Sequence, residues 1–497
     1  MNPELSTAIQ AQPAAAAQRA TKVRYGVLGF ACVLSMITYL DRVCFGTVAP
    51  FIQTEFQLSD AHLGMLFTAF ALAYAAFEVP TGWLGDVYGP RNTLIRIVVW
   101  WSVFTALTGL IYPEMLGLQT AFWALLAVRF FFGIGEAGAY PNIARAFHNW
   151  IPFTERGFAQ GAVWMSGRFA GGITPLVVTA LLITHVAADG TKVTAWRHIF
   201  WAFGVLGLVW CVLFFFWFRN RPEEKASVNQ AERDLIGSDD SHGDAHSGVP
   251  WMKLFTNANL WFLCLMYFCA AYGWYFNITW LPKLLKNHFH VTAENSGFWT
   301  FSFMAGAPLL FGSLACLVGG LMTDAFIKRT GNRKWGRRLF GLVGHGICAV
   351  CYFAGTFANN PWAFVLSIAF ATFWNDITMG SAWASCIDIG RRYSGIVAGC
   401  MNTIGNLGGA AAGMITGWVL THYNTPAESA PGAPMPMGWQ VNLWSYAGVY
   451  VLATFFWLLF DSTKPVVPDE PLQNRPIADN GRSEQIQPPA DQIRPGE

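Results

Sequence analysis

Two glycine patterns recur in this chain at one constant interval. The segment Gly82-Trp83-Leu84-Gly85-Asp86 returns 238 residues later as Gly320-Leu321-Met322-Thr323-Asp324, and each copy ends an apolar run and precedes a basic loop. The same interval carries the glycines at positions 157, 161, 167 and 171 onto those at 395, 399, 405 and 409. One interval that holds for both patterns indicates a duplicated membrane unit, an organisation that is typical of transporters.

The composition indicates that lipid surrounds most of the chain. Of its 497 residues, 54% are apolar and only 12% are charged, whereas soluble domains are roughly 25% charged. A helix that crosses a bilayer needs about 20 mostly apolar residues. Hydropathy predicts twelve such spans, at 24–46, 62–84, 93–112, 119–143, 157–184, 197–218, 258–284, 298–324, 338–358, 361–386, 393–421 and 440–460. The predicted fold class is therefore an all-α membrane protein with twelve transmembrane helices in two pseudo-symmetric six-helix halves.

The distribution of Lys and Arg predicts the orientation in the membrane. Of 31 basic residues, 24 lie on the side of both termini and only four lie in the opposite loops, namely Lys192, Arg197, Lys283 and Lys286. Both termini are therefore expected in the cytoplasm, and the chain in the cell (inner or plasma) membrane. The net charge of +2 reflects this asymmetry and gives no reason to expect nucleic acid as a partner.

The remaining segments divide the chain simply. We expect a disordered cytoplasmic tail at 1–22, an N-terminal half at 23–218, a charged cytoplasmic linker at 219–257, a C-terminal half at 258–460 and a disordered cytoplasmic tail at 461–497. One chain of twelve spans can form a complete pathway across the lipid bilayer, so a monomer is expected.

The remaining three basic residues are Arg42, Arg129 and Arg168, and these lie inside predicted spans. A charge at the bilayer centre costs at least about 2.5 kcal/mol and is normally paired and turned toward a cavity or the bundle interior. Acidic partners are near in sequence: Asp41 adjoins Arg42, and Glu136 follows Arg129 by seven residues on the same helical face. These groups could couple an ion to transport, or form static pairs that only lock helix packing.

The C-terminal half looks different at the corresponding positions. The 238-residue interval maps these charged residues onto neutral ones. In order, Asp41, Arg42, Arg129, Glu136 and Arg168 correspond to Thr279, Trp280, Ser367, Trp374 and Asn406. We therefore expect ion coupling in the N-terminal half, and aromatic walls with amide or hydroxyl donors from the C-terminal half. Asp376 does not fit this division. The sequence leaves open whether it is a second titratable site, a helix-packing acceptor or a group that faces the cavity.

Several motifs carry a family resemblance. The segment 82–91 resembles the loop signature of the major facilitator superfamily, and 320–329 resembles a degenerate second copy. The segments Tyr39-Leu40-Asp41-Arg42, 129–137 and 275–282 resemble the anion:cation symporter family, which includes bacterial hexuronate, glucarate and galactonate permeases and the animal sialin and vesicular glutamate carriers. The resemblance covers about residues 24–460.

The resemblance implies roles for individual residues. Asp41 and Glu136 match the proton-coupling sites of the family, and Arg42 and Arg129 match their salt-bridge partners. The positions that match substrate contacts are Tyr39, Tyr74 and Asn406, and we add Trp280 and Trp374 as candidate aromatic contacts within the spans.

Arg168 departs from the family pattern, because the sugar-acid carriers more often have a glutamine at this position. A guanidinium is a two-pronged donor for a carboxylate or phosphate. The substitution therefore suggests a more negatively charged substrate, or an additional partner for Glu136.

The repeated loop motif predicts a gate. Gly82, Asp86 and Arg91, with Asp324 and Arg329 in the second copy, lie at the membrane edge. There they are placed to make contacts between helices when the cytoplasmic side is closed. Positive-inside anchoring would explain the arginines but not the repeated aspartates.

We therefore predict a secondary active transporter that takes up an organic anion, a sugar acid (hexuronate, aldonate or aldarate) or another carboxylate, by proton-coupled symport. The transport alternative is an exchanger of organic anions, or of organophosphate for phosphate, in which Arg42 and Arg168 would bind phosphate and no acid would need to titrate. A nutrient sensor that does not transport is a further alternative, although the short tail argues against it.

No set of catalytic residues, metal-ligand cluster or nucleotide-binding loop is found in the sequence. An enzyme, a cofactor and a metal site are therefore not expected. The sequence does not name the anion, fix the stoichiometry or exclude sodium as the coupling ion.

Overall fold

The computed structural model describes residues 19–58, 60–186, 192–237, 249–291, 293–423, 425–426, 429–430 and 432–467. Most of the two predicted tails, and part of the predicted linker, lie outside the described residues. All described helices belong to one structural unit, Met1–Val467. Within the described ranges the fold is helical, apart from one two-stranded antiparallel hairpin.

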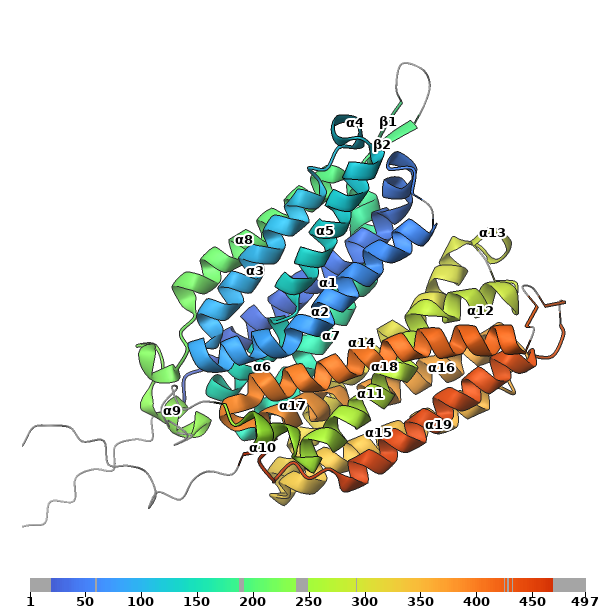
Figure 1. Cartoon of the computed structure of the whole chain (residues 1–497). Helices are drawn as coiled ribbons and strands as arrows, with labels where there is room; N and C mark the ends of the chain where they lie inside the picture. Colours follow the sequence, from blue (N-terminus) through green and yellow to red (C-terminus); the bar gives the residue numbers. More distant parts are fainter. Residues whose placement is uncertain are drawn as a thin grey trace, which may run out of the picture. The chain divides into compact units, whose positions relative to one another are not determined.

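The N-terminal half consists of long helices joined by short connections (Figure 1). Its long helices are α1 (Arg24–Glu55), α2 (Asp60–Tyr88), α3 (Pro90–Thr108), α5 (Leu118–Glu136), α6 (Ala139–Trp150), α7 (Arg156–Leu181) and α8 (Arg197–Trp217). The connections contain α4 (Pro113–Leu116), η1 (Phe153–Glu155) and a hairpin of β1 (Ile183–Val186) and β2 (Lys192–Ala195), in which Ile183 lies opposite Ala195.

The C-terminal half follows the linker elements η2 (Pro222–Glu224), α9 (Gln230–Ile236) and α10 (Trp251–Phe255). Its long helices are α11 (Ala258–Thr279), α14 (Phe298–Thr330), α15 (Arg333–Gly355), α16 (Pro361–Asp376), α17 (Met379–Gly390), α18 (Ser394–His422) and α19 (Met437–Leu459). The short elements of this half are α12 (Leu281–Asn287), α13 (Ala293–Ser296) and η3 (Arg391–Tyr393).

These helices account for the twelve predicted spans. Nine ranges of the described residues are long and apolar enough to cross a membrane; one of them, Leu118–Trp150, joins α5 and α6, and another, Pro361–His422, holds α16, α17 and α18. The helices α3 and α7 supply the remaining two spans. The fourth and tenth spans are broken by two-residue turns that hydropathy does not reveal, because neither turn, Ala137-Gly138 or Ile377-Thr378, contains a charged residue.

Local sequence signals set many helix ends. Asn257, Asn332 and Asn360 cap α11, α15 and α16, since each side-chain oxygen accepts a hydrogen bond from a backbone N–H of the first turn. Gly89 has a φ of 84°, which separates α2 from α3, and Pro90 then occupies the first position of α3, where it has no hydrogen bond to lose.

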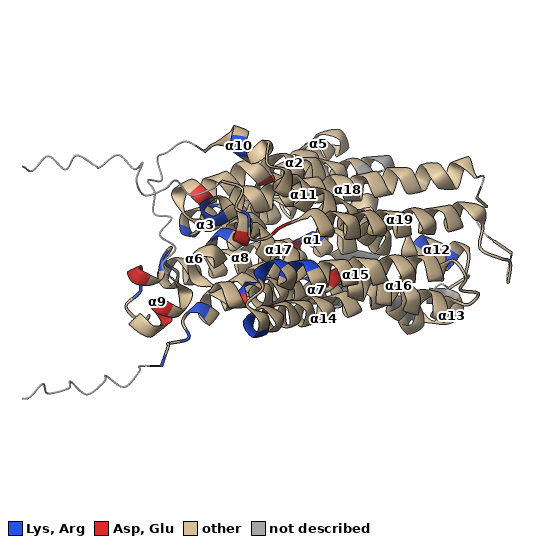
Figure 2. Ribbon diagram, turned by 90° about the horizontal axis from the view of Figure 1, so that it is seen from below, with Lys and Arg blue, Asp and Glu red and all other residues tan. Residues whose placement is uncertain are grey.

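We call the end of the bundle that carries α9 and α10 the linker end. Figure 2 shows charged residues gathered at the linker end, with a few near α12 at the other end. The linker is attached there through Glu232, whose carboxylate accepts hydrogen bonds from the backbone and side chain of Arg24 at 3.1 and 3.0 Å. Arg24 also pairs with Glu155 at 2.9 Å, so the linker, α1 and η1 are held together.

The two halves meet through helices that approach closely at glycines. A Cβ atom on Gly395 of α18 would lie 2.6 Å from the carbonyl oxygen of Gly82 on α2. Gly161 of α7 packs in the same way against the backbone of α14 at Cys316. The repeated glycines at positions 82, 157, 161, 320, 395 and 399 are therefore contact points between the halves, where a side chain would force the helices apart, whereas those at 167, 171, 405 and 409 pack within their own half.

We predict that Gly395→Ala destabilises the protein by about 1–3 kcal/mol, the usual cost of overpacking. The matched control is Gly413→Ala in the same helix, since a Cβ at Gly413 meets no atom within 4 Å. Thermal unfolding of the purified variants in detergent measures the difference. Equal unfolding temperatures for the two variants would contradict the close-packing account.

Candidate functional site

The two broken spans each place a carboxylate at the break. The helix α5 ends at Glu136 and α16 ends at Asp376, and each is followed by a two-residue turn and a second helix. The C-terminal end of a helix carries partial negative charge. A carboxylate at this position therefore depends on a cationic partner.

Glu136 has such a partner in Arg42 of α1. The Nε atom of Arg42 lies 2.8 Å from Oε1 of Glu136, whose side chain is only 1% exposed. The Arg42 side chain is 28% exposed and its guanidinium lies 4.5 Å from the ring centre of Tyr74. Arg42 therefore joins a buried acid to space that a solute can reach. The salt bridge of Glu136 is therefore formed with α1.

Asp41 and Arg129 lie in the same region without a direct pair among the described residues. Asp41 is 3% exposed and neither carboxylate oxygen has a hydrogen-bond partner in the described part of the chain. Arg129 lies over the rings of Phe45, Phe132 and Phe70 at 4.1, 4.9 and 5.0 Å. Ring faces attract a cation but neutralise no charge. Asp41 interacts electrostatically with both Arg129 and Glu136.

The candidate substrate contacts from the N-terminal half surround the arginines. The ring of Tyr39 packs against α7 at Gly167 and Gly171, where glycine leaves the space. Tyr39 interacts electrostatically with both Arg42 and Arg168. This tyrosine is therefore within electrostatic range of both guanidinium groups.

The substrate contacts predicted in the C-terminal half each pack against other residues of that half. Asn406 of α18 accepts a hydrogen bond from the hydroxyl of Tyr275 at 3.4 Å. Trp280 packs against Trp439, with ring centres 6.3 Å apart, and Trp374 packs edge-on against its neighbour Phe373. The structure does not place either tryptophan at an arginine of the site.

A tryptophan of the C-terminal half that does contact a site arginine is Trp274. Its ring centre lies 5.2 Å from the Arg168 guanidinium. It is not one of the two tryptophans selected from the sequence, Trp280 and Trp374. Trp274 lies within α11, whereas Trp280 follows the last residue of this helix, Thr279.

The sequence reasoning missed Glu78, a fully buried acid in α2. Its carboxylate accepts hydrogen bonds from Asn402, and from Thr403 and Asn406 at 3.4 Å, all on α18. Asn402 also lies 3.4 Å from the hydroxyl of Tyr74, and Tyr74 carries Arg42 on its ring. An acidic residue inside the apolar run 65–84 was the available signal. Glu78 thus connects the Arg42 site with the C-terminal half.

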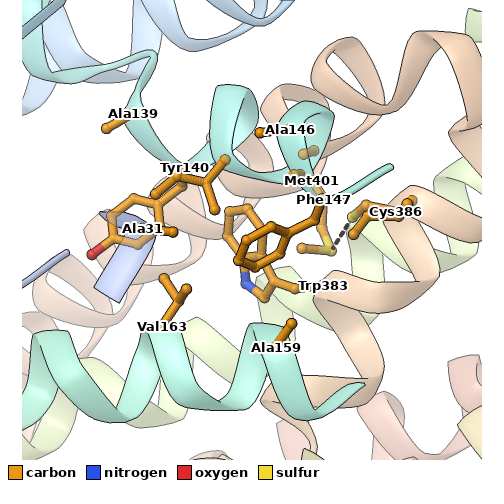
Figure 3. Close-up of a cluster of buried hydrophobic side chains, with 14 of the residues drawn as sticks. Ala31, Ala139, Tyr140, Ala146, Phe147, Ala159, Val163, Trp383, Cys386 and Met401 are labelled. Carbon is orange, nitrogen blue, oxygen red and sulfur yellow. Dashed lines mark hydrogen bonds between the residues drawn. The ribbon is translucent and has the colours of Figure 1, made fainter. Parts of the chain in front are cut away.

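An aromatic layer lies beside the site and is shared by both halves. Tyr140 of α6 stacks on Trp164 of α7 with ring centres 4.6 Å apart, and Trp164 contacts Trp383 of α17 at 5.1 Å. The indole N–H of Trp383 donates to the hydroxyl of Tyr267 at 3.1 Å. Figure 3 shows Trp383 lying among Tyr140, Phe147 and Val163 of the N-terminal half. Trp383 is completely buried, so in the observed state it helps to close this layer.

Arg168 pairs with Asp376, which the sequence had left unassigned. The Nη1 atom of Arg168 contacts Oδ2 of Asp376, with side-chain exposures of 3% and 0%. The pair joins α7 of the N-terminal half to α16 of the C-terminal half. Arg168 is therefore neutralised by Asp376 and not by Glu136.

Both repeated aspartates cap a helix of the opposite half. Asp86 accepts hydrogen bonds from the N–H groups of Gly395 and Ile396 at 3.0 and 2.8 Å. Asp324 accepts from those of Gly157 and Phe158 at 3.1 and 2.6 Å. These are the first turns of α18 and α7, where the helix dipole favours an anion. Because the donors are also 238 residues apart, the duplication extends to the contacts.

The cations at this end are not those that the motif suggested. Arg145 lies 3.7 Å from Asp86, and Arg337 lies 3.2 Å from Asp324. Asp388 is shared by Arg156 and Arg337 at 3.0 and 3.1 Å, which adds a further link between the halves.

Arg91 and Arg329 lie elsewhere. Arg91 donates to the carbonyl oxygen of Phe215 and stacks on its ring at 4.6 Å, within the N-terminal half. Arg329 is exposed in the last turn of α14, where a cation complements the helix dipole.

Comparison with known proteins identifies the family. The Major Facilitator Superfamily profile matches residues 31–413. The chain is 33% identical over 403 residues to the "Probable sulfoacetate transporter SauU" of Cupriavidus necator, covering 80% of this chain and 88% of the relative. This chain belongs to the Major Facilitator Superfamily.

Other similarities agree with this result. The chain is 26% identical to the "Probable galactarate/D-glucarate transporter GudP" of Bacillus subtilis, covering 81% of this chain and 87% of the relative. The proton:xylose symporter XylE has the same fold, with a TM-score of 0.67 at 14% identity over 89% of this chain and 98% of the other. The chain is therefore a multi-pass membrane protein and a secondary transporter, not an enzyme, with relatives among the anion carriers of the superfamily.

We predict that Asp86→Ala opens the linker end. The substitution removes two hydrogen bonds to a charged acceptor, each worth about 1.5–3 kcal/mol. The open population should therefore rise at least about tenfold. Spin labels at the exposed positions Tyr88 and Thr330 report the separation of the halves by electron resonance.

The matched control is Arg91→Ala, which changes the same motif but only contacts within the N-terminal half. Its label distances should equal those of the parent. If Arg91→Ala opens the linker end as much as Asp86→Ala does, the assignment of the gate to the aspartate caps is wrong.

Proposed function

We propose that this transporter is a proton-coupled symporter that takes up a small organic anion. It acts as a monomer in the cell membrane with both termini in the cytoplasm. The observation that carries the proposal is the buried ion pair between Arg42 and Glu136, beside Asp41, a buried carboxylate with no hydrogen-bond partner among the described residues.

The geometry supports competition between a proton and an internal salt bridge. Arg42 is neutralised by Glu136, so its attraction for an anion is weak while the salt bridge with Glu136 is intact. A proton on Glu136 removes that carboxylate's charge, which leaves the guanidinium available for the anion. Burying an ionised acid without donors is costly, and protonation of Asp41 removes this cost. Proton and anion therefore favour each other's binding.

The conformation supports the proposed order of events. The aspartate caps and the aromatic layer close the linker end, and this end is the cytoplasmic one if Lys and Arg set the orientation. Protons and substrate would therefore enter from the outside. Rocking of one half against the other then exposes the site to the cytoplasm, where the lower proton concentration restores the pair between Arg42 and Glu136.

The substrate class follows from the number of cations at the site. Two guanidinium groups, those of Arg42 and Arg168, interact electrostatically with Tyr39, and each can bind a carboxylate or sulfonate through paired N–H groups. A small acid with a carboxylate fits this arrangement. Sugar acids and sulfoacetate, the compounds in the names of the relatives, are members of this class.

We predict that proteoliposomes containing the protein accumulate a labelled acid only when an inward proton gradient is imposed. The panel contains hexuronates, aldonates, aldarates, sulfoacetate, aromatic carboxylates and sugar phosphates, and a parallel arm replaces the proton gradient with a sodium gradient. Flux that needs no gradient but requires phosphate or another anion inside the vesicles would establish an exchanger and contradict the proposal.

We predict that Glu136→Gln abolishes accumulation driven by the proton gradient but keeps some exchange of substrate. Glutamine keeps the size of the side chain but cannot change its charge. The control is Glu55→Gln, whose carboxylate also pairs with an arginine, Arg197, outside the site; this variant should accumulate substrate normally. A Glu136→Gln protein that concentrates substrate as well as the parent would remove Glu136 from the coupling mechanism.

A further inference from the structure

The broken spans show that the internal repeat extends to the buried acids. The helices α5 and α16 end at residues 136 and 376, and the helices that follow, α6 and α17, end at residues 150 and 390. Both pairs of ends are 240 residues apart. Asp376, and not Trp374 as the 238-residue interval suggested, is therefore the structural counterpart of Glu136. The expectation of a neutral second half at this position is corrected.

The two acids differ in where their arginine comes from. Glu136 takes Arg42 from its own half, whereas Asp376 takes Arg168 from the opposite half. The structure makes room for the second pair at Gly312 of α14, where a Cβ would come within 3.2 Å of Arg168 and closer still to Asp376. The amide of Asn375 donates to the other oxygen of Asp376 at 2.8 Å. Asp376 is thus held firmly against Arg168.

Among the residues that the structure describes, the other groups around this pair supply no competing negative charge. Arg168 interacts electrostatically with Tyr39 of α1, Tyr267 of α11, Cys316 of α14 and Tyr450 of α19. These side chains are ordinarily neutral at physiological pH. Behind Asp376, His345 of α15 interacts with Asn375 and lies 3.3 Å from the Thr378 hydroxyl.

One side of Arg168 remains unused. Its buried Nε has no hydrogen-bond partner among the described residues, and its guanidinium faces the rings of Trp164 and Trp274 at 5.9 and 5.2 Å. An incoming anion can therefore use this donor, but it can neutralise Arg168 only if it shares or replaces the carboxylate of Asp376.

We propose that Asp376 is a second proton-coupling acid, located in the C-terminal half, which occupies Arg168 until the transported anion replaces it. This inference rests on the proposed symport. A proton from the outer water converts the Asp376 carboxylate to a neutral carboxyl group, Arg168 keeps its charge, and the anion binds to Arg168. In the cytoplasm the carboxyl group returns its proton to water, binds Arg168 again and expels the anion. Because this pair joins the halves, its exchange is linked to their movement.

The test is the number of protons carried per anion, measured from the reversal potential in proteoliposomes with labelled sulfoacetate or whichever acid of the panel the parent concentrates. Asp376→Asn should still transport the acid but carry one proton fewer for each anion. Asp376→Glu restores a titratable group and should restore the parental ratio. The control is Glu232→Gln, another fully buried acid paired with an arginine, in the linker; it should leave the ratio unchanged.

An unchanged ratio in Asp376→Asn would overturn the inference and leave Asp376 as a packing residue. A parent protein that concentrates no acid would instead contradict the proposed symport. In that case infrared difference spectra still test the role of Asp376. The spectrum of the purified, substrate-free protein at neutral pH is subtracted from its spectrum at acidic pH. They should contain a protonated-carboxyl band that Asp376→Asn removes and Glu136→Gln retains, whereas the same bands in parent and Asp376→Asn would refute the role of Asp376.

Discussion

Buried charge is the constraint on which the rest of this structure depends. An unpaired ion inside a membrane costs several kcal/mol, and the spans hold three arginines. Two of them are neutralised by acids at helix breaks, Arg42 by Glu136 and Arg168 by Asp376, while Arg129 lies over aromatic rings. Such pairs are stable only while nothing else offers the same charge. A proton or an anion that enters the site therefore changes which arrangement is favoured.

The helix breaks explain why the acids are where they are. A continuous span would bury the last carbonyl groups of α5 and α16 in hydrogen bonds to the next turn, whereas a break leaves the negative end of the helix dipole at the site. A carboxylate placed there binds its arginine tightly when ionised and loses the need for it when protonated. The duplicated fold has two such carboxylates paired with an arginine at a helix break. One pair lies within the N-terminal half and the other joins the two halves.

Much of this arrangement could be predicted from the sequence. Hydropathy, the 238-residue repeat and the basic loops predicted the twelve-helix fold in two halves, because this depends on composition and local spacing. The partners of Asp86 could not be predicted, since they are backbone N–H groups of α18 that any sequence would supply. Glu78 was missed because its donors come from the other half. The fixed interval also misled us at Asp376, because the two halves differ by two residues before the break.

The central claim is that anion binding and protonation of the buried acids favour each other. Calorimetry of the purified protein with its transported acid, in buffers that differ in ionisation enthalpy, measures the protons taken up when one anion binds. Our account predicts net proton uptake on binding, and less uptake in Glu136→Gln. Binding with no proton exchange in the parent protein would show that the pairs are static and would contradict the account.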